Sequence, residues 1–181
     1  PPLFLRAAAA VAWSAPENYT LNAAQSVVAF TYNFQGNPSE GRMPVKDARM
    51  ELDLRNVPAS HVEVTLDASE AKAGFLFATQ AMKGPNVLNT DQFPEIHFRS
   101  TKITGDLRGA EIQGDLTIRD VTRPVTLRAG LYRQEGTEKG DRSRLIVQLN
   151  GKVSRAAFGA GGFPGFVDDM INLNIIARIE K

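Results

Sequence analysis

The feature that most constrains this chain is an alternation of apolar and polar residues with a period of two. Successive side chains of a β-strand point to opposite faces, so this period is typical of strands with one buried and one solvated face. The sequence therefore predicts an all-β protein of about eight strands. The alternating stretches are residues 26–34, 49–54, 61–66, 96–99, 112–118, 125–131, 144–153 and 171–179.

Short polar connections separate these stretches, and they favour antiparallel neighbours. The longest early connection, Gln35–Pro44, contains two glycines and two prolines and is predicted to be a loop. Many short strands at regular spacing are typical of a sandwich or a closed barrel. The alternation is the same in both, and at eight strands a barrel is either filled by side chains or holds one small ligand.

Residues 69–92 break the alternation. Ala71, Phe75, Ala78 and Met82 recur there at helical spacing, and Gly84-Pro85 follows as a stop signal. The sequence thus predicts one helix at about residues 70–83, near one end of the barrel.

The composition excludes several classes of protein. With 181 residues and 43% hydrophobic residues, the chain is long enough to bury the core of a single domain. Its formal net charge of +1 argues against nucleic-acid binding, and it has no polybasic patch for docking on anionic membranes. The absence of cysteine excludes disulfides, thiolate nucleophiles and cysteine-based zinc sites.

Residues 1–15 differ from the rest of the chain. Arg6 precedes an alanine-rich apolar stretch, and Ala10-Val11-Ala12 matches a cleavage site of the Ala-x-Ala type. This arrangement is typical of the end of a secretory signal peptide, and it predicts a periplasmic protein. The alternative is a short alanine-rich helix that belongs to the folded protein as an N-terminal extension.

The candidates for chemistry are few. His61 and His97 fall on wet faces of different strands, and no third ligand is spaced to join them at a metal. Asp168 and Asp169 are adjacent and are expected to be solvated loop charges. The glycine-rich run Gly159–Gly165 lacks the Lys-Ser/Thr of a phosphate-binding loop, and no Gly-x-Ser-x-Gly elbow is present. We expect no catalytic residues, no metal and no cofactor.

Three blocks in order carry a resemblance to a known family. They are Phe93–Ser100 (FPEIHFRS), Gly114–Leu127 (GDLTIRDVTRPVTL) and Phe158–Asp169 (FGAGGFPGFVDD), and they follow an opening strand that begins near Tyr19. On this β pattern the chain resembles the YceI-like family of bacterial envelope proteins over roughly residues 18–180. The resemblance makes residues 16–181 one YceI-like lipid-binding barrel domain.

The resemblance implies a lipocalin-like antiparallel barrel that binds an amphiphilic lipid without chemistry. The ligand would be an isoprenoid, an isoprenoid quinone or a fatty acid, carried or stored in the periplasm. No nucleic acid and no stable membrane insertion are expected, and a homodimer is possible. The apolar residues expected to line the barrel and its mouth are Phe30, Tyr32, Phe34, Phe75, Phe77, Met82, Val87, Leu88, Phe98, Phe158, Phe163 and Phe166.

Two alternatives remain open at this stage. The same apolar residues can simply fill a core, in which case the protein is a structural or interaction module without a ligand. An enzyme acting on a lipid or quinone would need a polar cluster that points inward, and the sequence places none.

Overall fold

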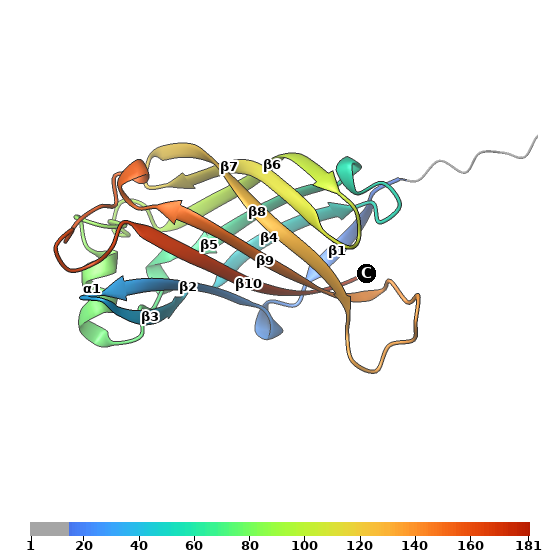
Figure 1. The fold of residues 1–181 in the computed structure, drawn as a ribbon, viewed down its shortest axis with the longest axis horizontal. Coiled ribbons are helices and arrows are strands. Elements are labelled where there is room, and N and C mark those ends of the chain that lie inside the picture. Colours follow the sequence, from blue (N-terminus) through green and yellow to red (C-terminus); the bar gives the residue numbers. More distant parts are fainter. Residues whose placement is uncertain (1–14) are drawn as a thin grey trace, which may run out of the picture.

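The computed structural model describes residues 15–181, which form one antiparallel sheet and one α-helix (Figure 1). The helix is α1 (Leu76–Lys83), and four 3₁₀ turns are η1 (Ala23–Gln25), η2 (Val57–Ala59), η3 (Ala68–Glu70) and η4 (Ala156–Phe158). The strands are β1 (Glu17–Leu21), β2 (Val27–Phe34), β3 (Asn37–Arg42), β4 (Val45–Leu52), β5 (His61–Asp67), β6 (Glu95–Gly105), β7 (Ala110–Ile118), β8 (Val121–Arg133), β9 (Arg144–Ser154) and β10 (Met170–Glu180).

The sheet closes on itself. Its order is β1-β4-β5-β6-β7-β8-β9-β10-β2-β3, and a further pairing of β1 with β10 completes an eight-stranded barrel. In that pairing Thr20 lies opposite Glu180 and Leu21 opposite Ile179. The strand β2 continues along the same edge of β10 after the turn η1, and β3 pairs with β2. The predicted antiparallel barrel of about eight strands is confirmed, with two strands added.

The prediction of a loop at residues 35–44 was wrong, because β3 occupies most of it. Gln35 and Gly36 adopt positive φ angles of 49° and 81°, which makes a two-residue hairpin between Phe34 and Asn37. Pro38 is compatible with a strand here because β3 is the last strand of the sheet formed by residues 15–181.

The predicted helix exists but begins later than expected. Gly74 has a φ of 97° and Phe75 is extended, so the chain turns helical only at Leu76. The preceding segment is extended and bridges β3: the amides of Arg42 and Lys72 each donate to the other's carbonyl, at 2.8 and 2.9 Å. This bridge places α1 at the end of the barrel where β2 meets β3 (Figure 1).

The two ends of the barrel differ. At the end opposite α1, Tyr19, Leu145 and Ile179 are buried in one cluster. Gln134, also buried, donates from Nε2 to the carbonyls of Leu145 at 3.1 Å and Ile179 at 3.4 Å. Part of that end is therefore filled by packed side chains, while Leu54, Val57 and Leu107 of the same end line the free interior.

Candidate functional site

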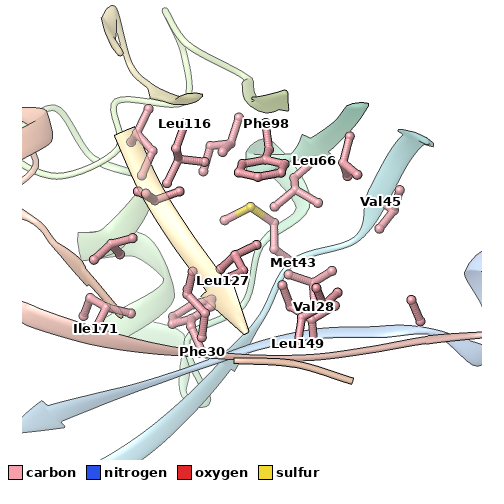
Figure 2. Close-up of a pocket in the computed structure, with 18 of the residues that line it drawn as sticks. Val28, Phe30, Met43, Val45, Leu66, Phe98, Leu116, Leu127, Leu149 and Ile171 are labelled. Atoms are coloured by element: carbon pink, nitrogen blue, oxygen red, sulfur yellow. The ribbon is translucent and has the colours of Figure 1, made fainter. Parts of the chain in front are cut away.

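The barrel encloses an apolar cavity of about 540 Å³. Every strand of the closed barrel contributes at least one lining side chain, because the period-two pattern turns one apolar face of each strand inward. Figure 2 shows such side chains converging on a shared space, with the thioether of Met43 reaching into it. The labelled residues in that view are Val28, Phe30, Met43, Val45, Leu66, Phe98, Leu116, Leu127, Leu149 and Ile171.

Two glycines explain why large rings do not fill this space. A Cβ atom at Gly114 would lie 2.4 Å from Cζ of Phe98, and one at Gly41 would lie 2.2 Å from Cζ of Phe30. Each phenyl ring thus lies flat over a glycine of the neighbouring strand, where any side chain would displace it. The rings line the wall, and the centre of the barrel stays open.

The structure places nearly all of the sequence-predicted residues around this cavity. Phe75 is the exception: it lies outside the lining, is 44% exposed, and packs edge-on against Phe34 with ring centroids 5.8 Å apart. The predicted residues that do line the cavity are Phe30, Tyr32, Phe34, Phe77, Met82, Val87, Leu88, Phe98, Phe158, Phe163 and Phe166.

The polar side chains in the lining are already hydrogen-bonded within the protein. The hydroxyl of Tyr32 donates to the carbonyl of Ala73, and burial raises the pKa of this phenol, so it stays neutral. Ser60 accepts from the amide of Asp53 at 2.9 Å, and Ser26 donates to the carbonyl of Asn22 at 2.6 Å. The interior therefore favours hydrocarbon over a charged or strongly polar group.

Arg155 lines the cavity, and sequence reasoning missed it. It is only 9% exposed, and its guanidinium donates to four backbone carbonyls of the loop between η4 and β10. Burial lowers the pKa of this guanidinium, and the nearby carboxylates of Asp169 and Asp168 offset only part of that shift. An arginine suits this place because it carries five donors in a rigid fork. The acceptors are the carbonyls of Ala160 (2.9 Å), Gly162 (2.8 Å), Val167 (2.8 Å) and Asp168 (3.1 Å).

Arg119 ties the same loop to the segment that follows α1. From the turn between β7 and β8, its Nη1 donates to the carbonyls of Pro85 (3.1 Å), Val87 (3.1 Å) and Gly159 (2.9 Å). The amide of Gly162 adds a bond to the carbonyl of Asn86 at 2.9 Å. The carbonyls of this glycine-rich loop thus find donors outside it, and no motif in the sequence marks those donors.

Asp169 has a structural role beyond that of a solvated charge. Its carboxylate accepts from the hydroxyl of Ser154 at 2.5 Å and from the amide of Ala156 at 2.7 Å. These two bonds lower its pKa, with a smaller contribution from Arg155. Asp168 is exposed and accepts from Nδ2 of Asn33 at 3.1 Å. The two carboxylates thus serve different partners and form no paired acid–base site.

The histidines lie on the outer face of the barrel, as the sequence predicted. His61 is exposed, and His97 contacts Thr65 Oγ1 through Nδ1 (3.1 Å) and Glu95 Oε2 through Nε2 (3.3 Å). Within residues 15–181, no cluster of three or more His, Asp or Glu side chains is arranged to hold a metal ion. The same residues include no helix that is long and apolar enough to span a bilayer.

Comparison with known proteins decides the family. The model of the YceI-like domain matches residues 19–179. The chain belongs to the YceI-like family. Protein YceI of Escherichia coli O17:K52:H18 and that of Shigella flexneri are each 30% identical to it over 112 residues, which is 62% of this chain. The match spans 58% of the length of each relative.

Several solved structures share this fold. BcnA of Burkholderia cenocepacia superposes with a TM-score of 0.76 at 17% identity, over 88% of this chain and 99% of its own. The Campylobacter jejuni YceI protein superposes with a TM-score of 0.65 at 22% identity, over 78% of this chain and 84% of its own. A third structure is a polyisoprenoid binding domain from Saccharophagus degradans, which is implicated in plant cell wall breakdown. It superposes with a TM-score of 0.62 at 11% identity, over 90% of this chain and 97% of its own. At these identities the likeness is one of fold.

Proposed function

We propose that this YceI-like protein binds an amphiphilic lipid in its barrel and carries or stores it without chemical change. The cavity is the observation that carries the proposal. It measures about 540 Å³, within the range of roughly 300–1,000 Å³ typical of small-molecule sites. Its lining is apolar, and its few polar side chains already have partners in the protein. A hydrocarbon chain is the ligand that such a wall solvates best.

The ligand class is an isoprenoid, an isoprenoid quinone or a fatty acid. A bulky branched or straight chain would lie along the barrel, with its head group at the α1 end, where Phe77, Phe163 and Phe166 are exposed and also line the cavity. Each heavy atom of a larger ligand contributes at most about 0.3 kcal/mol, so a chain of about 40 carbons reaches about 12 kcal/mol. That free energy corresponds to roughly nanomolar affinity without any charged contact.

Two further observations support this assignment. The Saccharophagus degradans neighbour is a polyisoprenoid binding domain with the same fold. The N-terminal segment with its Ala10-Val11-Ala12 site, which lies outside the described residues, is typical of export and supports a periplasmic role. A lipid that crosses an aqueous compartment has to be shielded from water, and a barrel of this kind supplies the shield.

Native mass spectrometry of the freshly purified protein, followed by organic extraction, tests the proposal. A stoichiometric adduct of several hundred daltons that releases an isoprenoid, quinone or acyl chain is the expected result. A bare polypeptide mass, with no uptake after incubation with such lipids, would instead support a module without a ligand.

A further inference from the structure

We propose that the α1 end of the barrel docks transiently on a lipid bilayer by inserting an apolar rim around the cavity mouth. The inference rests on the proposed function, since a membrane is the place from which a carried lipid is taken or to which it is delivered. The apolar rim consists of Phe75, Leu76, Phe77, Phe163 and Phe166.

The rim exposes large apolar side chains that a soluble surface normally avoids. Leu76 is 73% exposed and Phe77 is 69% exposed, and both stand at the start of α1, a helix with no buried residue. Phe163 and Phe166 are exposed on the loop between η4 and β10, which reaches the same end of the molecule (Figure 1). Contiguous exposed apolar residues of this kind mark interaction sites.

The rim is continuous with the cavity. Phe77, Phe163 and Phe166 are exposed on the outside and also belong to the cavity lining. Phe34 joins the two halves of the rim: its ring contacts Phe75 at 5.8 Å and stacks on Phe166 at 6.4 Å, centroid to centroid. A lipid leaving the cavity past these rings would pass directly into whatever apolar phase covers them.

The charges around the rim fit a bilayer rather than a protein partner with a salt-bridged interface. The chain has 20 Asp and Glu residues, yet residues 71–90 carry only Lys72 and Lys83, and residues 156–167 carry no charge. Of the acids near the rim, Glu40 pairs with Arg42 at 3.3 Å, and the exposed Asp168 accepts a hydrogen bond from Asn33 at 3.1 Å. Carboxylates are repelled by phospholipid head groups, whereas lysines can extend towards the phosphates.

Docking of this kind depends on buried apolar area and needs no polybasic patch, in agreement with the neutral composition. The helix keeps its place through Met82, which packs against the core, and through local hydrogen bonds, such as the amide of Ala73 donating to Thr79 Oγ1 at 2.9 Å and the amide of Leu88 to the carbonyl of Met82 at 2.9 Å.

The test uses the full chain, whose lack of cysteine allows a single label. Leu76→Cys and Tyr132→Cys, each carrying a polarity-sensitive fluorophore, are mixed with phosphatidylcholine vesicles with and without phosphatidylglycerol. Tyr132 is 55% exposed at the far end of β8 and is the matched control. We expect a blue shift at position 76 that persists in high salt, and none at position 132.

Vesicle flotation supplies the second measurement. Leu76→Glu should reduce the floating fraction by about tenfold, because a carboxylate at the membrane-facing position opposes insertion, whereas Tyr132→Glu should not change it. Neither residue lines the cavity, so both variants should retain bound lipid in native mass spectrometry.

The outcomes separate this inference from the proposed function. If the protein carries lipid but does not float with vesicles, and the fluorophore at position 76 shows no blue shift, the docking proposal is overturned and lipid carriage is left intact. A concentration-dependent dimer that Leu76→Glu abolishes, without vesicle binding, would assign the rim to a second copy and also overturn it. Docking at position 76 by a protein that never takes up lipid would contradict the proposed function alone.

Discussion

The guanidinium of Arg155 donates a 2.8 Å hydrogen bond to the carbonyl of Gly162, so a buried cation at the end of β9 holds the glycine-rich loop of the cavity mouth. The same side chain reaches Ala160, Val167 and Asp168. A loop whose carbonyls converge on one side chain keeps a single conformation without a hydrophobic core of its own. The same loop carries Phe163 and Phe166, whose rings line the cavity.

Replacing Arg155 should therefore destabilise the loop between η4 and β10 at the cavity mouth. Arg155→Lys keeps the charge but cannot reach four carbonyls at once, and we expect it to lower the free energy of unfolding by about 2–4 kcal/mol. Urea unfolding gives this value, and hydrogen exchange should show lost protection in residues 158–169. Arg123→Lys is the control, because Arg123 is exposed and makes one 3.3 Å bond to the carbonyl of Ala157. Equal effects of the two variants would refute the role assigned to Arg155.

The cavity can be filled from one strand. Leu149→Trp projects a larger ring into the interior, and we expect it to abolish lipid retention while the protein stays folded, because the ring occupies existing space. Gln148→Trp adds the same ring to the outer face of β9, where the side chain is exposed, and should retain lipid like the original protein. Native mass spectrometry compares the two. Full lipid retention by Leu149→Trp would place the ligand elsewhere.

The hydroxyl of Tyr32 should control how firmly the segment before α1 is held. Tyr32→Phe removes the bond to the carbonyl of Ala73 and leaves that buried carbonyl without this donor. We expect a loss of about 1–2 kcal/mol in the free energy of unfolding and a faster exchange of bound lipid, measured with a fluorescent fatty acid. Tyr132→Phe, at an exposed position, should change neither quantity. Slower exchange in Tyr32→Phe would contradict the tethering role.

Much of the fold was predictable because the period-two pattern is a local property of the chain. The strand β3 was missed for a local reason too: Asn37–Arg42 holds a proline and a glycine and no apolar residue, so it lacks the alternation. It exists because Gln35 and Gly36 form a tight turn that folds it back on β2. Phe75 was expected in the lining as one of the apolar residues near the mouth, yet it lies just before the helix, which begins at Leu76, and its ring packs against Phe34.

The cavity itself was beyond the sequence. A filled barrel and a hollow one show the same alternation, and the difference depends on which residue faces which across strands. Phe98 lies over Gly114 and Phe30 over Gly41 only in the observed register. Arg155 was missed for a related reason: its acceptors are backbone carbonyls, which carry no sequence signal, and only the path of the loop brings them together.

The last prediction concerns acid stability. Hydrogen bonds from Ser154 and the amide of Ala156 lower the pKa of Asp169 in the folded protein below its ordinary value of 3.8. Its contribution to stability is therefore fully present above that value and is lost as the pH falls through the lower, folded pKa. Asp169→Asn should lower the free energy of unfolding at neutral pH and flatten its decline below about pH 4.

Urea unfolding at a series of pH values measures this difference directly. Asp168→Asn is the matched control, because it removes a neighbouring charge and leaves both bonds of Asp169 in place. If Asp169→Asn and Asp168→Asn gave parallel curves, the stabilising contribution would belong to the net charge of the loop. A flattened curve for Asp169→Asn alone would show that the carboxylate acts through Ser154 and Ala156, which fix the start of η4 at the cavity mouth.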